Sequence, residues 1–185
     1  MKKSLKLFVM AVLMLSAVAC DQLEDLVVTK VPGVSNIDYK IKEPAGSEAF
    51  VKVQPVELVK PDSLGYKDHL RALQINSIAA QVLQYTGTES HIISDLKLYY
   101  AQEGTTAYTE LGTIDTLDLY NLAVRESIVY VQFIDKERDE PILKEMILAD
   151  KKVNFKLVGL NPSKKGIETT IRFRVDANLS VGLKN

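Results

Sequence analysis

The sequence predicts a mainly β domain, an antiparallel sandwich-like fold with one or two short helices. The main observation is the segment from Ile167 to Val181, where apolar and polar residues alternate as in a strand with one buried and one solvated face. Further runs of β-branched and aromatic residues recur along the chain, and turn-forming residues separate them. An α+β fold, in which an antiparallel sheet packs on a helix, stays open as the alternative.

The first half of the chain predicts several strands that end at glycine and proline residues. The turn signal Pro32-Gly33 precedes the first strand, and residues 43–46 end it. Pro55 predicts an edge strand or a break, because proline cannot donate to a sheet ladder. The expected elements are strands at 34–42, 50–53, 56–59, 73–85 and 92–100 and a short helical turn at 66–72.

Alternation assigns faces on two of these strands. Leu96, Leu98 and Tyr100 share one face of the strand at 92–100. On the strand at 73–85, the residues expected to share a face are Leu73, Ile75, Ala79, Leu83 and Tyr85. The chain turns at 103–105, and these two runs are expected to form an antiparallel pair.

A strand at 108–117 leads into a segment, 119–150, whose secondary structure the sequence leaves open. Residues 128–134 are rich in β-branched and aromatic side chains, which favour a strand. The residues that suit a helix equally well are Leu119, Leu122 and Val129.

A helix is expected at 139–149. Pro141 suits its first turn, and Asp139 or Glu140 can serve as its cap and as the partner of its dipole. The charged run at 135–140 alternates in sign and is expected to be a solvated loop with local ion pairs. It lacks the glycine and the spaced acidic set of a calcium loop.

The last part of the chain is expected to form a hairpin. Val153, Phe155 and Leu157 alternate with polar residues, and residues 160–166 would then join this strand to the one at 167–181. At ~3.3 Å per residue the last strand would be about 50 Å long, so a bend or a bulge is expected in it.

Residues 1–20 have the layout of an export signal. A basic start precedes an apolar stretch that ends in the small residues Ala17-Val18-Ala19, followed by Cys20. The apolar stretch is too short to span a bilayer, which needs ~20 apolar residues. The sequence therefore predicts a removed signal peptide at 1–19, an N-terminus and flexible tether at 20–32, and a single β-rich domain at 33–185.

Ala17-Val18-Ala19-Cys20 resembles the lipobox of bacterial lipoproteins. The resemblance covers residues 1–20 only, and it implies that Cys20 becomes the first residue and carries diacylglycerol and a fatty acyl group such as palmitate. Several acyl chains give a stable anchor, whereas one chain holds only marginally. Ala17 departs from the family pattern, where leucine is most frequent, and Ala17-Val18-Ala19 also suits an ordinary signal peptidase that cuts the same bond. Plain secretion and an uncleaved anchor therefore stay open.

The acidic residues after Cys20 indicate where in the cell envelope the protein is placed. Asp21 directly after the cysteine resembles an inner-membrane retention signal of enterobacterial lipoproteins, whereas the acidic segment 21–25 resembles a surface-export signal of Bacteroidetes-type lipoproteins. A solvated acidic leader is the third interpretation. We expect an exported chain that is anchored to the cell envelope, at the outer membrane, with its periplasmic or surface face undetermined.

Composition excludes several classes of protein. The residues after position 19 carry 20 basic and 24 acidic side chains, a poor match for nucleic acid, which needs a clustered basic surface. Cys20 is the only cysteine, so no intrachain disulfide can form. The chain has no tryptophan on which to build an aromatic carbohydrate platform.

Few residues are candidates for chemistry. The two histidines, His69 and His91, have no H-E-x-x-H or C-x-x-C context, so no metal and no catalytic residue is predicted. Nothing in the spacing of Asp115 and Asp118 marks a paired-carboxylate site. The only aromatic concentration comprises Tyr85, Tyr99, Tyr100 and Tyr108. Neighbouring strand residues face opposite ways, so one of Tyr99 and Tyr100 is expected in the core and the other at the surface.

The sequence thus favours a non-enzymatic lipoprotein of the cell envelope that binds a partner or has a structural role. Its expected partners are the lipid bilayer, through the Cys20 lipid, and an envelope protein or glycan, and no cofactor is expected beyond the acyl groups. One alternative is a carrier of an apolar ligand in a cavity lined by residues such as Phe173, Leu157 and Leu98. The other is a hydrolase of envelope polymers that uses His69 or His91.

Overall fold

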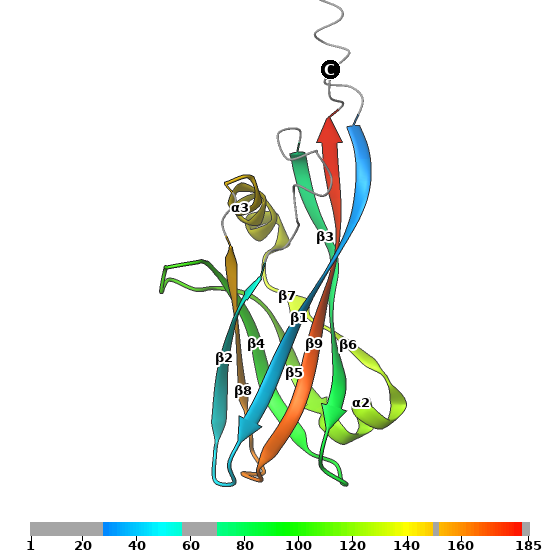
Figure 1. The fold of residues 1–185 in the computed structure, drawn as a ribbon, viewed down its shortest axis with the longest axis vertical. Helices are drawn as coiled ribbons and strands as arrows, with labels where there is room; N and C mark the ends of the chain where they lie inside the picture. Colours follow the sequence, from blue (N-terminus) through cyan, green and yellow to red (C-terminus); the bar gives the residue numbers. More distant parts are fainter. Residues whose placement is uncertain (1–27, 57–69, 150–151, 183–185) are drawn as a thin grey trace, which may run out of the picture.

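The computed structural model describes residues 28–56, 70–149 and 152–182. Two antiparallel sheets face each other as a sandwich, and two short helices accompany them (Figure 1). The predicted fold class is therefore confirmed, and the sheets do not close into a barrel.

Sheet A contains four strands in the order β1-β9-β3-β6, and sheet B contains five in the order β2-β8-β4-β5-β7. In chain order the elements are β1 (Val28–Glu43), β2 (Ala49–Val56), β3 (Leu70–Tyr85), β4 (Ile92–Gln102), β5 (Thr109–Asp118), α2 (Leu119–Arg125), β6 (Ile128–Tyr130), β7 (Gln132–Phe133), α3 (Lys136–Leu148), β8 (Val153–Leu160) and β9 (Ile167–Gly182).

The core lies between the sheets and is built from the alternating inward residues of the long strands. Leu96, Leu98 and Tyr100 of β4 are each about 1% exposed, so the face predicted for this strand is confirmed. From β9, Phe173 meets Tyr39 of β1 edge to face, with ring centroids 5.7 Å apart. Burying a large apolar side chain in this way stabilises a fold by roughly 1.5–3 kcal/mol.

The face predicted for β3 is wrong at Ala79 and Leu83, whereas Tyr85 packs against the core as expected. The pairing of β3 with β9 shifts register between Ile75 and Ser77, and each extra residue reverses the alternation. Ile78, not Ala79, therefore points inward, and Leu83 is 42% exposed. A bulge was expected in the last strand, β9. The bulge lies instead in its neighbour β3, and the register of β9 with β1 is continuous.

Two expected strand pairs are also wrong. The runs at 73–85 and 92–100 belong to β3 in sheet A and β4 in sheet B, and the strands at 153–157 and 167–181 belong to β8 in sheet B and β9 in sheet A. The connections between them therefore cross from one sheet to the other. Alternation reports which face of a strand is buried, but it carries no information on which strand lies beside it.

The first strand begins at Val28, so the expected turn at Pro32-Gly33 is wrong. Within the described residues β1 pairs only with β9, and an edge strand accepts a proline whose nitrogen faces away from the ladder. The edge position predicted for Pro55 is confirmed, because β2 pairs only with β8 in the part of the chain that the structure describes.

Parts of two expectations lie outside the described residues. The strand expected at 56–59 is described only at Val56, which ends β2. The helical turn expected at 66–72 is described only at 70–72, and these residues belong to β3.

The segment that the sequence left open contains both kinds of element. Asp118 caps α2 by accepting from the backbone N–H of Asn121, and β6 and β7 follow in different sheets. Between β6 and β7, the N–H of Val131 donates to the carbonyl of Ile78 in sheet A at 2.8 Å. The next residue, Gln132, already pairs with β5 in sheet B. The chain thus changes sheets at Val131.

Helix α3 begins earlier than expected. Asp135, not Asp139 or Glu140, is its cap, and its carboxylate accepts from the N–H of Arg138 at 3.0 Å. Most of the charged run at 135–140 therefore lies in the first turns of the helix rather than in a solvated loop, and Pro141 lies inside the helix. The acidic cap favours this start, since it satisfies an N–H that has no partner within the helix.

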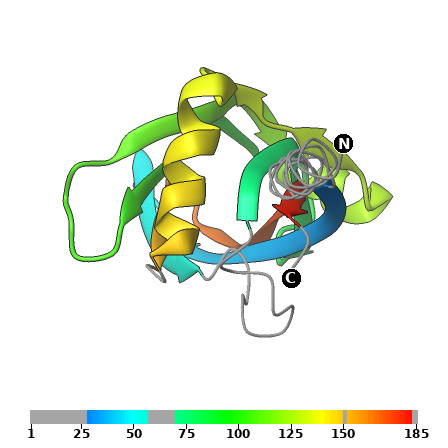
Figure 2. The same cartoon turned by 90° about the horizontal axis from the view of Figure 1, so that it is seen from above.

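Two consecutive acidic residues fix α3 to both sheets. Glu140 Oε1 accepts from the backbone N–H of Ile75 in β3 at 2.7 Å, and Asp139 Oδ1 accepts from the hydroxyl of Tyr100 in β4 at 2.9 Å. We call this region the helix end; it comprises α3, the starts of β1 and β3 and the end of β9 (Figure 2). The loop end, at the opposite pole, comprises the connections 44–48, 86–91 and 161–166.

Candidate functional site

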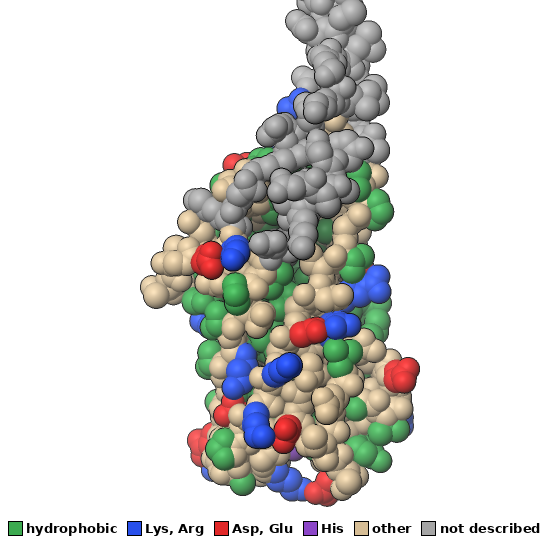
Figure 3. All heavy atoms as spheres, in the orientation of Figure 1, with side chains coloured by type: hydrophobic (Ala, Val, Ile, Leu, Met, Phe, Trp, Pro, Cys, Tyr) green, Lys and Arg blue, Asp and Glu red, His purple; other side chains and the backbone are tan. Residues whose placement is uncertain are grey.

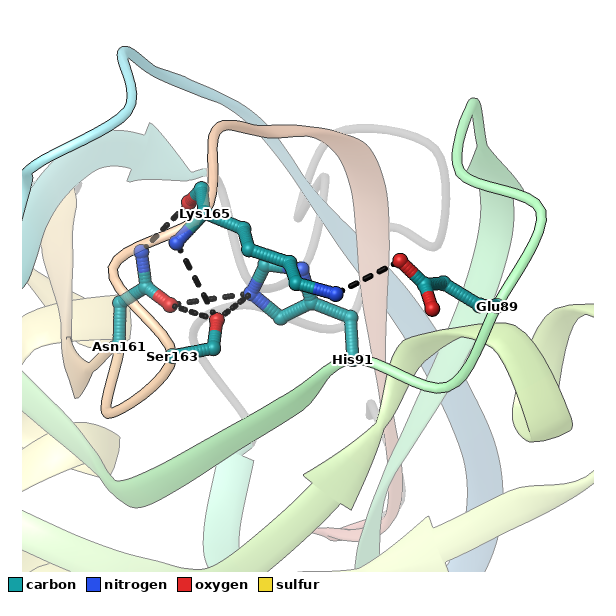
Figure 4. A network of polar contacts seen from close by, with 5 residues as sticks. All are labelled: Glu89, His91, Asn161, Ser163 and Lys165. Atoms are coloured by element: carbon teal, nitrogen blue, oxygen red, sulfur yellow. Dashed lines mark hydrogen bonds and ion pairs between the residues drawn. The ribbon is translucent and has the colours of Figure 1, made fainter.

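The densest cluster of polar side chains is at the loop end and includes His91 (Figure 4). His91 lies directly before β4 and is 3% exposed, and its ring contacts the ring of Tyr85 edge to face at 6.2 Å. Its polar partners come from the connection 161–166, some seventy positions later in the chain. The sequence singled out His91, but it gave no indication of Asn161 and Ser163.

Asn161 organises this cluster and is 1% exposed. Its Nδ2 donates to the carbonyl of Ser47 at 2.9 Å and to the carbonyl of Lys165 at 2.8 Å, so these carbonyls fix the orientation of the amide. Its Oδ1 therefore faces His91, whose Nε2 lies 3.0 Å away. One buried side chain thus connects three loops.

The arrangement assigns the proton on His91. Because Asn161 Oδ1 can only accept, the nearby Nε2 of His91 must donate. Ser163 Oγ lies 3.3 Å from the same nitrogen and donates to Asn161 Oδ1 at 3.0 Å. A general base needs a free nitrogen lone pair directed at the serine hydroxyl, and this nitrogen has none. The Ser163–His91 contact therefore joins loops and does not activate a nucleophile in this state.

Exposed ion pairs surround the cluster. Lys165 Nζ lies 2.6 Å from Glu89 Oε1, and this hydrogen bond holds the pKa of Glu89 below its ordinary value. Lys164 pairs with Glu48 at the same distance. All four side chains are at least half exposed, and ion pairs of this kind contribute little to stability.

Asp118 acts as a helix cap next to these loops. Burial works to raise its pKa, but the hydrogen bonds from Ser90 and Asn121 outweigh it and hold the pKa below the ordinary value. Asp115 is exposed, three positions earlier. The two carboxylates therefore have separate surroundings and do not form a paired site.

A second polar cluster lies at the helix end. Asp139 is fully buried, and its Oδ1 accepts from Tyr100 and from Arg138 Nε at 2.8 Å, while its Oδ2 is buried without a hydrogen-bond partner among the described residues. Burial, and then the hydrogen bond to Asp139, raise the pKa of Tyr100 to about 12. Arg138 also donates to the carbonyl of Glu110 at 3.1 Å. Apart from the charges of residues 135–140, nothing in the sequence indicated this cluster.

An apolar cavity of about 20 Å³ lies beneath α3. Leu143 and Ile147 of α3 line it together with residues of both sheets, among them Ile75 and Phe155. A volume of this size holds about one water, whereas ligand pockets measure about 300–1,000 Å³. Phe173, Leu157 and Leu98, which were expected to line a cavity, are packed in the core.

The tyrosines follow the expected alternation. Tyr100 is 1% exposed, and Tyr99 faces the outer side of sheet B, where Lys156 Nζ lies 4.5 Å from its ring centroid. The same ammonium group lies 4.2 Å from the ring of Tyr108. A cation over two aromatic faces stabilises this outer surface locally.

Cys20 and His69 lie outside the described residues, so their predicted roles stay predictions. Within the described ranges, no group of three or more potential ligands could hold a metal ion. No helix in the described part of the chain is long and apolar enough to cross a membrane. Acidic and basic side chains are mixed over the face drawn in Figure 3.

No family model and no curated protein matches the chain. Among solved structures, it is similar to turnip yellow mosaic virus at 100 K, with 7% identity, a TM-score of 0.35 and coverage of 86% of this chain and 97% of that one. The decameric BFDV capsid protein gives 10% identity, a TM-score of 0.37 and coverage of 83% and 99%. The nodavirus of the giant freshwater prawn Macrobrachium rosenbergii gives 12% identity and a TM-score of 0.30, with coverage of 85% of this chain and 97% of that one. These scores are too low to support a statement on fold or function.

Proposed function

We propose that this chain is a lipid-anchored module of a bacterial cell envelope that binds a partner or has a structural role and is not an enzyme. The observation that carries the proposal is Cys20, the only cysteine, placed directly after a basic and apolar leader that ends in small residues. A lone cysteine at the start of an exported chain would otherwise be a free thiol that pairs between molecules.

Two features of the structure support the proposal. The first strand begins at Val28, close after the proposed anchor, so a folded domain follows the tether directly. The second feature is the contact between His91 and Ser163 at the loop end. His91 carries a proton on Nε2, the nitrogen that a general base acting on this serine would need free.

The test is the mature mass of the protein, measured after expression in a bacterium that is fed labelled palmitate. The chain is expected to begin at residue 20, to carry the label and to partition with the membrane. Cys20→Ala is a matched control, because Ala17-Val18-Ala19 remains a site for ordinary signal peptidase. That variant is expected to be exported without label and to be released in soluble form. A wild-type mature chain without lipid would contradict the proposal.

A further inference from the structure

The two ends of the sandwich are unequally placed relative to residue 20. Val28 and Leu70 both pair with the last residues of β9, so the chain enters the domain at the helix end (Figure 1). Lys144 of α3 donates to the carbonyl of Arg71 at 3.3 Å, which joins the helix to the same end. The connections 44–48, 86–91 and 161–166 are at the other end of the same strands.

The length of chain before β1 limits how far the helix end can be from Cys20. Seven residues lie between Cys20 and Val28, so the eight Cα-to-Cα steps from one to the other span at most about 29 Å when fully extended. In contrast, β1 itself has 16 residues and is roughly 50 Å long at ~3.3 Å per residue. The loop end thus lies one strand length beyond the point where the chain enters the domain, and the helix end lies within reach of the short leader.

We propose that the helix end is the surface that faces the bilayer, with lipid headgroups as its partner, and that the loop end points away from the membrane. This inference rests on the proposed lipid anchor at Cys20. Lys30 in β1 and Arg71 in β3 are exposed at the helix end, where basic side chains suit a layer of lipid phosphates. The loop end, held together by Asn161, is then the surface available to a partner in solution.

The outer face of sheet A carries ion pairs that oppose a flat position on the membrane. Arg172 of β9 holds Asp38 of β1 with two hydrogen bonds of 2.7 Å, and Arg174 pairs with Asp176 beside them. These ion pairs are largely hydrated, and a headgroup layer would have to displace their water. Both outer faces also expose apolar side chains, Val34 and Leu83 on sheet A and Val51 and Val53 on sheet B, and the test samples the outer face of sheet B.

The experiment uses the lipidated full-length chain with single introduced cysteines. A lipidated Cys20 has its sulfur in a thioether, so an introduced cysteine is the only free thiol that a maleimide fluorophore can label. Glu145→Cys places the fluorophore at the helix end and Glu48→Cys at the loop end. The two sites are matched, because each glutamate is over 70% exposed and joins only one surface ion pair. Val53→Cys samples the outer face of sheet B.

Each labelled protein is inserted into vesicles of phosphatidylethanolamine and phosphatidylglycerol that contain a headgroup spin label as quencher. We expect the probe at position 145 to be quenched at least threefold more than the probe at position 48, with position 53 between them. Equal quenching at 145 and 48 would refute the orientation. Quenching at 53 as strong as at 145 would show the domain lying on sheet B, and would refute it as well.

The wild-type chain distinguishes this failure from a failure of the anchor. It is expected to take no maleimide and to sediment with the vesicles. Labelling of Cys20 in a chain that stays in the supernatant would refute the anchor and the orientation together. Quenching of the probe at position 48 in a chain that sediments would refute the orientation alone.

Discussion

The two polar clusters of the sandwich differ in how completely their buried groups are satisfied. At the loop end, the amide of Asn161 uses both its nitrogen and its oxygen, with partners in all three connections. At the helix end, Oδ1 of Asp139 accepts hydrogen bonds, while Oδ2 has no partner in the part of the chain that the structure describes, and a small apolar cavity lies beneath the same helix. The first cluster defines one arrangement of the loops, because each group left unpaired there would carry a penalty. The second leaves room for repacking.

The largest effect is expected for Asn161→Ala. The substitution leaves the carbonyls of Ser47 and Lys165 and the ring of His91 without their partner, and we expect a loss of about 3 kcal/mol in the free energy of unfolding. Urea unfolding measures it. Lys164→Ala, in the same loop but in an exposed ion pair, is the control and should change stability by less than about 0.5 kcal/mol. Similar losses in both variants would contradict the role given to Asn161.

Tyr100→Phe tests the cluster at the helix end. It removes one of the donors to the buried Asp139, and hydrogen bonds to charged groups contribute about 1.5–3 kcal/mol, so a loss of about 2 kcal/mol is expected. Replacing Asp139 by leucine as well removes the buried charge, and the double variant Tyr100→Phe/Asp139→Leu should lose less than the sum of the two single losses. Additive losses in thermal unfolding would show that the hydroxyl and the carboxylate are not coupled.

Alanine substitutions at two glycines compare how tightly the loop end and the helix end are packed. A Cβ at Gly159, near the loop end, would lie 2.5 Å from Phe50 Cζ, whereas a Cβ at Gly33, at the helix end, would meet nothing closer than 3.9 Å. We expect Gly159→Ala to cost about 1–2 kcal/mol through overpacking, and Gly33→Ala to stabilise by about 0.5 kcal/mol. Melting temperatures of the two variants should therefore move in opposite directions. A shift in the same direction would remove the contrast in packing.

The smallest effect is a pH dependence at Asp118. Its pKa in the folded state is below the ordinary value, so its stabilising contribution is present above about pH 4 and is lost as the pH falls through the folded pKa. Wild type and Asp118→Asn should differ in stability by a constant amount at neutral pH, and the difference should shrink in acid. Unfolding curves at several pH values measure it. A difference that grows below pH 4 would mean that the sign of the shift is wrong.

The faces of regular strands were predictable from the sequence. Burial alternates strictly from Leu96 to Tyr100 of β4 and from Ile167 to Val175 of β9, so the spacing alone places Leu98 and Phe173 in the core. On β3 the same rule fails, because the register shift at 75–77 reverses the alternation and no residue type there announces it. Partner strands were not predictable either, since β3, β4, β8 and β9 all have one apolar face and suit either sheet.

The candidate sites were less predictable than the fold. His91 stood out by its type, but its hydrogen-bond partner Asn161 is brought to it only by the crossing of two loops between the sheets. The dipeptide Asn161-Pro162 indicated a turn, and turn residues are usually exposed, so the burial of the Asn161 side chain was not expected. Asp139 looked like a surface charge in a run of charges, and only the tilt of α3 over Tyr100 makes it a buried one.

The prolines of the edge strands β1 and β2 affect how closely copies of the protein can be spaced on a surface. β1 and β2 are free edges within the described residues, and an ion pair of 2.8 Å between Lys52 and Glu43 joins them. Pro32 on one edge and Pro55 on the other offer no N–H to an approaching strand. A neighbouring copy therefore cannot pair along the full length of β1 or of β2, which protects these two edges against fibril formation. Copies confined to a surface can then be dense and remain separate.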